Sequence, residues 1–112
     1  MHINIETSQL DLPANTRSNL KMRILKRMGR LAQRVVNLQV TLADTNGQRG
    51  GRDKLCTLTA KLTAGRQIVV TQQSHTAAHA LFRAVRRLRR LVSKQPRQPK
   101  AARRRDWSAA SA

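Results

Sequence analysis

The sequence predicts a small α+β domain with the element order β-α-β-β-β-α, in which two helices pack on one face of a four-stranded sheet. Three observations support this fold class. Four short segments alternate apolar and polar residues, as half-buried strands do. Two longer segments repeat apolar residues with the helical period. The chain has 112 residues, which is enough for one small domain.

The first strand and the first helix occupy the N-terminal third. Residues 2–7 alternate, with two isoleucines on one side. Pro13 suits the first turn of a helix, because its missing N–H is not needed there. We expect this helix to run to about Ala32. Its expected apolar face consists of Leu20, Ile24, Leu25, Met28 and Leu31. Gly29 costs about 1 kcal/mol relative to alanine in a helix interior, so it indicates close packing or early fraying.

Three further strands are expected at 36–42, 54–63 and 67–73. Their expected inward residues are Val36, Leu38, Val40 and Leu42, then Cys56, Leu58, Ala60 and Leu62, then Ile68 and Val70. The outward positions are rich in threonine, glutamine and asparagine, which fits a sheet with one wet face. Both helices must then lie on the other face. Residues 44–52 are glycine-rich and basic, which predicts a mobile loop, and glycine at 65 favours a tight turn.

The last helix is expected at 76–94, with Ser74 or Thr76 as its cap. Its apolar side consists of Ala77, Ala80, Leu81, Ala84, Val85, Leu88, Leu91 and Val92. After Val92 the pattern ends in prolines, small residues and basic residues, which cannot bury enough surface to fold alone. The sequence therefore predicts a folded domain over 1–93 and a disordered basic tail over 94–112.

The charge of the chain indicates a polyanionic partner. Lysine and arginine number 23 against five acids, for a formal net charge of +18. The candidate RNA-binding residues form one stripe on each helix: Arg23, Lys26, Arg27, Arg30 and Arg34 on the first, and Arg83, Arg86, Arg87, Arg90 and Lys94 on the second. An ordinary solvated helix face carries mixed signs, yet neither helix contains an acid. Such stripes predict contact with phosphates rather than base reading.

Composition also excludes several classes of protein. The single phenylalanine and single tryptophan are too few for a domain that stacks bases on aromatic rings, or for a membrane-surface helix. No apolar run could span a bilayer, and the N-terminus lacks the pattern of a signal peptide. The lone cysteine fits a reducing compartment. We therefore expect a cytoplasmic protein.

No residue set predicts catalysis, a cofactor or a small-molecule substrate. His75 and His79 stand four apart at a helix start, but no nearby cysteine or acid completes a metal site. A surface or capping role is expected for both histidines. Cys56 is expected to be a small buried core residue. The sequence thus favours a binding protein over an enzyme.

Four stretches together resemble a known family. They are HINIETSQLDLP, VVNLQVTLAD, the hairpin around TAGRQIVVTQQ, and AAHALFRAVRRLRRL. They resemble the ribosome hibernation-promoting factors, the family that includes ribosome-associated inhibitor A, over roughly residues 1–95. The resemblance implies a fold like that of the double-stranded-RNA-binding domain. It further implies binding to the small ribosomal subunit and its rRNA, in the channel for messenger RNA and tRNA anticodon arms.

The implied activity is inhibition of translation under stress or in stationary phase, by a protein that is monomeric off the ribosome. Basic residues on both helices of the family face the rRNA. In this chain those are Arg23, Lys26, Arg27, Arg30, Arg83, Arg86, Arg87 and Arg90. The family usually begins its second helix with the form D-M-Y-A-A-I-D, whereas residues 76–82 read TAAHALF, so Phe82 stands in place of an acid.

Two further departures concern the C-terminus. The tail is basic, whereas some family members carry an acidic tail that opposes ribosome dimerisation. The chain is also too short for the separate dimerisation domain of the long members, so any pairing of ribosomes would need a second factor. An alternative is a generic RNA- or DNA-binding protein of the same fold, which the stripes predict equally well. A third class is an interaction module whose acidic partner is another protein.

Overall fold

A computed structural model describes residues 1–8, 10–44 and 54–95 of the chain. The elements are β1 (His2–Ser8), α1 (Ala14–Met28), the 3-10 helix η1 (Gly29–Arg34), β2 (Val35–Asp44), β3 (Lys54–Leu62), β4 (Gln67–Ser74) and α2 (Ala77–Lys94). The predicted α+β class and the order β-α-β-β-β-α are confirmed.

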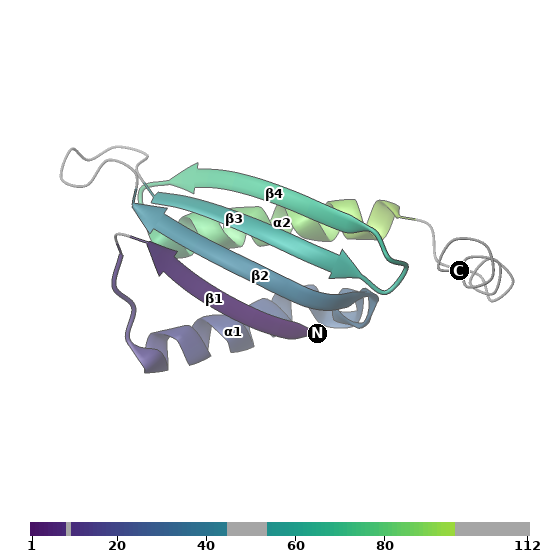
Figure 1. The fold of residues 1–112 in the computed structure, drawn as a ribbon, viewed down its shortest axis with the longest axis horizontal. Coiled ribbons are helices and arrows are strands. Elements are labelled where there is room, and N and C mark those ends of the chain that lie inside the picture. Colours follow the sequence, from purple (N-terminus) through teal and green to yellow (C-terminus); the bar gives the residue numbers. More distant parts are fainter. Residues whose placement is uncertain (9, 45–53, 96–112) are drawn as a thin grey trace, which may run out of the picture.

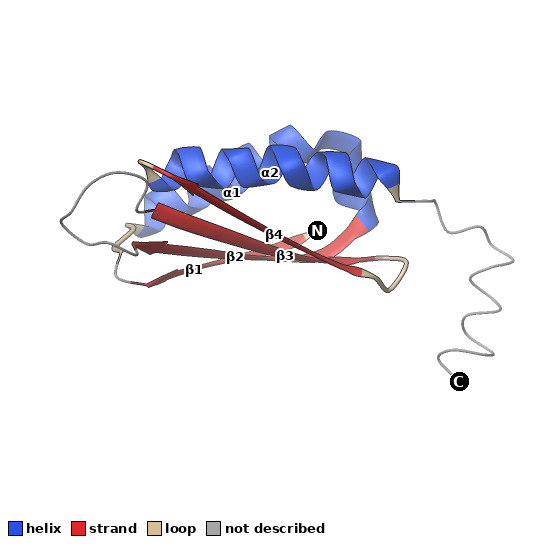
Figure 2. Cartoon of the chain, turned by 90° about the horizontal axis from the view of Figure 1, so that it is seen from above, coloured by secondary structure: helices blue, strands red, loops and turns tan. Residues whose placement is uncertain are grey.

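The four strands form one mixed sheet in the order β1-β2-β3-β4. Strand β1 runs parallel to β2, and the β2–β3 and β3–β4 pairs are antiparallel. Because β1 and β2 are parallel, the chain must cross over between them, and α1 makes that crossover. Figure 1 shows both helices behind the sheet, and Figure 2 shows them as one layer above it.

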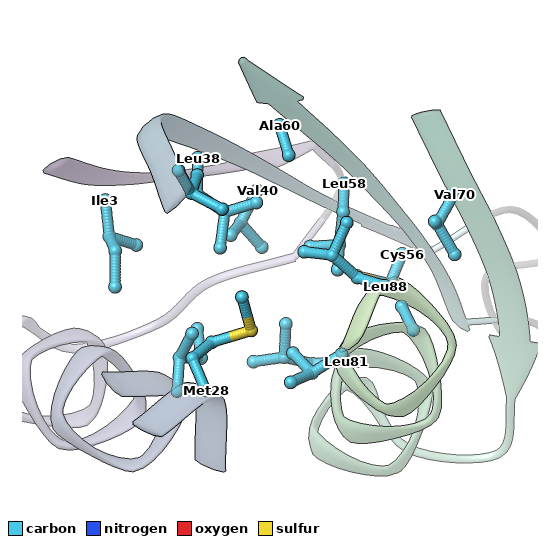
Figure 3. Packing of buried hydrophobic residues seen from close by; sticks show 14 of the residues in the cluster. Ile3, Met28, Leu38, Val40, Cys56, Leu58, Ala60, Val70, Leu81 and Leu88 are labelled. Carbon is cyan, nitrogen blue, oxygen red and sulfur yellow. The ribbon is translucent and has the colours of Figure 1, made fainter. Parts of the chain in front are cut away.

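The core lies between the two helices and the covered face of the sheet (Figure 3). The inward residues of adjacent strands line up in register, for example Leu38 opposite Ala60 and Ala60 opposite Ile68. From the helices, Ile24 and Met28 of α1 enter this layer. The buried residues of α2 are Ala80, Leu81, Ala84, Val85, Leu88 and Val92, so its predicted apolar side is confirmed.

The predicted course of the first helix is wrong at its C-terminal end. Helix α1 stops at Met28, and the backbone turns at Gly29, which has φ 56° and ψ −129°. A Cβ at Gly29 would meet no atom within 4 Å, so this glycine serves backbone conformation and not close packing. Leu25 is also wrongly placed in the apolar face: it is 42% exposed, because the helix rotates it away from Ile24 and Met28 toward solvent.

The predicted alternation of the second strand is wrong at its start. The register with β3 shifts between Val35 and Asn37, and this irregularity turns Val35 inward and Val36 outward. Val35 is 2% exposed and Val36 is 43% exposed. From Leu38 to Leu42 the predicted alternation is confirmed, with every second residue buried.

Local features at the connections are largely as expected. Gly65 has φ 92° in the tight turn between β3 and β4. Thr76, not Ser74, caps α2, since its hydroxyl accepts a hydrogen bond from the His79 backbone N–H at 3.1 Å. Asp44, expected in a loop, ends β2, and Lys94, expected to begin the tail, ends α2. Apart from Gln95, the rest of the expected loop at 44–52 and of the expected tail at 94–112 lies outside the described residues and stays a prediction. Within the described residues, no helix combines the length and apolar character needed to cross a bilayer.

Candidate nucleic-acid interface

Helix α2 separates its apolar and basic residues onto opposite sides. Arg83, Arg86, Arg87, Arg90 and Lys94 are all exposed, while the opposite side is buried against the sheet. Packing of the apolar side fixes the rotation of the helix about its own axis. The five cations therefore project away from the core, as the sequence predicted.

Helix α1 presents a second set of cations beside the first. Arg23, Lys26, Arg27 and Arg30 are exposed, with Arg30 just beyond the end of α1 in η1. Leu20, Ile24 and Met28 hold the opposite side of α1 in the core. Both helices lie on the same face of the sheet (Figure 2). The two basic stripes thus belong to one surface, which we call the helix layer.

Phe82 joins the two stripes. It lies on α2, partly buried against the core, and the guanidinium carbons of Arg23 and Arg27 from α1 lie over its ring. Their distances to the ring centroid are 4.3 Å and 4.5 Å, within the range of a cation–π contact. Sequence reasoning missed this contact. The i, i+4 spacing of the two arginines was visible, but nothing in the sequence told which residue of α2 would face them.

Arg34 stands apart from the other predicted site residues. Its side chain is half-buried, and Nη2 donates a hydrogen bond to the Gln95 carbonyl oxygen at 2.5 Å. The Gln95 side chain in turn accepts from Arg66 at 3.1 Å. Cations at a helix C-terminus also interact favourably with its dipole. Arg34 therefore ties η1 to the end of α2, and its guanidinium is partly engaged before any ligand arrives.

The acids of the described chain lie outside the two helices. Neither α1 nor α2 contains an acid. Glu6 is on β1 at an outward position, and Asp11 is in the connection before α1. Asp44 pairs with Lys54 at 3.1 Å, at the end of the β2–β3 pair where Lys54 also lies opposite Ser74 of β4. No described acid on the helices themselves offsets their cations.

The open face of the sheet has a different character. One row across it is Asn4, Gln39, Thr59 and Val69, and another is Glu6, Thr41, Thr57 and Thr71. A side-chain hydrogen bond of 2.9 Å links Asn4 to Gln39 within the first row. Lys61 adds a single positive charge on the outward side of β3. The domain therefore has a cationic helix layer and a nearly neutral sheet face.

The environments of His79 and Cys56 are those of structural residues. His79 Nδ1 lies in hydrogen-bonding contact with the hydroxyl of the buried Ser74. Among the described residues, no cluster of three or more histidine, cysteine or acidic side chains could hold a metal ion. Cys56 is fully buried, and burial raises the pKa of its thiol to about 12. A thiol with that pKa stays protonated near neutral pH and is a poor nucleophile.

Comparisons with known proteins are consistent with this fold. A ribosomal subunit interface protein from Coxiella burnetii matches with a TM-score of 0.69 and 19% identity, over 84% of this chain and 96% of that one. The N-terminal domain of Protein Y from Thermus thermophilus matches with a TM-score of 0.67 and 21% identity, over 84% of this chain and 98% of that one. These identities establish the shared fold alone. No curated protein sequence matches the chain.

A family model covers most of the chain. The model described as "Sigma 54 modulation protein / S30EA ribosomal protein" matches residues 3–100, which includes every strand and both helices except the first residue of β1. The resemblance found in the sequence is thereby confirmed. The chain belongs to the Sigma 54 modulation protein / S30EA ribosomal protein family, a family of ribosome-associated proteins.

Proposed function

We propose that this protein is a ribosome hibernation factor that binds the small ribosomal subunit and its rRNA in the channel used by messenger RNA and tRNA. It inhibits translation by occupying that channel in stressed or stationary-phase cells. The observation that carries the proposal is the acid-free helix layer, on which both basic stripes are exposed side by side. Family membership supports ribosomal RNA as the polyanion.

The proposed mechanism is steric and electrostatic, without a chemical step. A small cationic domain enters a space lined with phosphates and excludes the ligands of translation. Each phosphate contact releases condensed counterions, so affinity falls steeply as salt rises. The RNA-contacting residues we propose are Arg23, Lys26, Arg27, Arg30, Arg83, Arg86, Arg87, Arg90 and Lys94, with Arg34 in a supporting position. The protein acts in the cytoplasm, as a monomer when off the ribosome, and needs no cofactor.

A second candidate function is general binding of RNA or DNA through the same surface. It is favoured by the composition of the helix layer, because exposed arginines and lysines contact phosphates of any sequence. The two candidate functions predict different ligand preferences. A hibernation factor binds the assembled subunit orders of magnitude more tightly than a plain RNA duplex, whereas a general binder does not.

Sedimentation through a sucrose gradient tests the proposal. We expect the protein to migrate with the small subunit or the whole ribosome at moderate salt, and to be displaced by excess messenger RNA and tRNA. Arg86→Glu combined with Arg90→Glu should abolish this binding without unfolding the protein, because both side chains are exposed. Migration at the top of the gradient, or equal affinity for bulk RNA, would refute the ribosome channel as the site.

A matched control separates site from net charge. The double variant Arg86→Glu with Arg90→Glu lowers the formal net charge of +18 by four units. His2→Glu, Lys61→Glu and Gln73→Glu together cause the same change at exposed outward positions of the sheet. We expect this triple variant to bind ribosomes far better than the helix variant. Equal loss in both would show that the total charge, and not the helix layer, determines binding.

A further inference from the structure

Phe82 holds two arginines of the neighbouring helix in one place. The guanidinium carbons of Arg23 and Arg27 lie 4.3 Å and 4.5 Å from the centroid of its ring. The two carbons are therefore at most about 8.8 Å apart, the sum of those distances. Phe82 is the single phenylalanine of the chain, and it comes from α2 while both arginines come from α1. Such a contact ties the two basic stripes together across the seam between the helices.

Two guanidinium groups this close repel each other, and long exposed side chains are otherwise free to move apart. The negative face of the aromatic ring attracts both cations and offsets part of that repulsion. Phe82 thereby restricts side chains that would otherwise lose freedom at the moment of binding. Affinity improves when such an ordering cost is met before the ligand arrives.

A cation–π contact leaves the hydrogen-bond donors of an arginine available. An aromatic ring attracts the flat face of a guanidinium. The five N–H donors of the guanidinium point outward in its own plane, away from the ring. A carboxylate at the same position would instead accept hydrogen bonds from those N–H groups, and it would compete with any anion for them. The aromatic side chain therefore orders Arg23 and Arg27 without consuming their hydrogen-bonding capacity.

The upper limit on the spacing of the pair is compatible with a phosphate. A guanidinium that donates to a phosphate oxygen places its carbon on the order of 4 Å from the phosphorus. One phosphodiester between the two groups can thus contact both arginines, or two successive phosphates can take one each. We propose that Phe82 is a positioning residue, which organises Arg23 and Arg27 into a paired site for the phosphodiester backbone of RNA. This inference rests on the proposed function for the statement that the RNA is ribosomal. The geometry of the contact between Phe82 and the two arginines is independent of that function.

The competing explanation is that Phe82 only fills space between the helices. A leucine at the same position would then serve nearly as well, since Phe82 already packs against the core as a partly buried apolar residue. The two explanations differ in what an aromatic ring adds. Tyrosine keeps the π face, leucine keeps apolar bulk without it, and aspartate offers a carboxylate in its place.

The experiment compares Phe82→Leu, Phe82→Tyr and Phe82→Asp in the full chain. Two ligands are used in parallel: purified small subunits, and a plain RNA duplex of about 16 base pairs, which supplies phosphates without a ribosome. Ordering a side chain on binding weakens affinity by about two- to tenfold. We therefore expect Phe82→Leu to bind the duplex about tenfold more weakly than wild type, with both arginines released. Phe82→Tyr should stay within about twofold of wild type.

Two readouts separate positioning from packing. In the free protein, the δ-methylene protons of Arg23 and Arg27 should show ring-current shifts that Phe82→Leu abolishes and Phe82→Tyr preserves. Arg27→Gln should weaken duplex binding less in the Phe82→Leu background than in wild type, whereas Arg87→Gln should weaken it equally in both. Phe82→Asp should bind more weakly than Phe82→Leu, and its salt dependence should be shallower.

The outcomes are distinguishable from a failure of the proposed function. Wild-type affinity in Phe82→Leu, equal losses in the leucine and tyrosine variants, or equal effects of Arg27→Gln in both backgrounds would each overturn the inference. If wild type ignores the small subunit but the three variants rank as expected on the duplex, the ribosomal role fails and the positioning role of Phe82 stands.

Discussion

Replacing Gly29 with alanine tests how α1 ends. The residue has φ 56° and ψ −129°, a combination that L-residues avoid. A Cβ there would touch nothing within 4 Å, so no steric clash with the rest of the protein contributes. Backbone strain of this kind costs about 1–3 kcal/mol. Alanine also restricts the unfolded chain, which returns about 0.4–1 kcal/mol, and we expect a net destabilisation of about 1–2 kcal/mol.

Urea unfolding followed by circular dichroism measures this free energy. For a folded region of this size, each kcal/mol also lowers the thermal midpoint by about 4–8 °C. If α1 instead continued through position 29, alanine would stabilise the protein by about 1 kcal/mol, because glycine is the poorer helix former. The sign of the change therefore decides between the two conformations. A neutral or stabilising Gly29→Ala would refute the helix end described above.

Two controls sharpen this test. Gly29→Asn should not restore stability, because asparagine tolerates left-handed helical geometry with ψ near +47° and not a ψ of −129°. D-alanine introduced at position 29 by chemical ligation should stabilise the protein instead, since these angles are allowed for the mirror-image residue. Destabilisation by D-alanine would mean that position 29 has some other constraint.

Two further predictions concern Arg34 and Cys56. Arg34→Met keeps an apolar stem but loses the bond to Gln95, and should lower the free energy of unfolding in urea by about 1–2 kcal/mol while weakening ribosome binding less than Arg87→Gln does. Burial raises the pKa of the Cys56 thiol from its ordinary 9.0 to about 12 in the folded protein, so the unfolded chain loses its thiol proton first. Stability should therefore be intact below pH 9 and fall as pH rises toward 12, by up to about 1.4 kcal/mol per pH unit, and Cys56→Ala should lack this slope.

The sequence predicted those parts of the fold in which one periodicity persists over many residues. The apolar side of α2 follows the helical period from Ala77 to Val92, so each cation could be placed correctly on the opposite side. The alternation of β3 and β4 was equally regular. These segments bury one continuous face, and that burial leaves a strong and repeated signal.

The misplaced residues lie where regular structure is interrupted. The end of α1 depends on a backbone turn at Gly29, and apolar residues such as Leu31 continue the pattern past it. The register shift between Val35 and Asn37 inverts a single residue, and two adjacent valines give no indication of which one faces inward. The contact of Phe82 with Arg23 was hidden for another reason: it depends on how two helices lie side by side, and that relation has no local signature.

The distribution of charge links stability to binding. The helix layer has both basic stripes and no acid, so its cations repel one another whenever the domain is folded. A polyanion that neutralises them relieves this repulsion, and it binds the folded domain more tightly than the unfolded chain, whose charges are dispersed. Ligand binding of that kind raises the free energy of unfolding.

Charge interactions are screened over about 8 Å at physiological ionic strength, so the field of the helix layer acts mainly at close approach. The neutral sheet face offers an approaching RNA no comparable attraction. The surface whose like charges destabilise the isolated domain is thus also the surface that orients the domain on its ligand. The ring of Phe82 contacts both Arg23 and Arg27, and it offsets part of the repulsion between them.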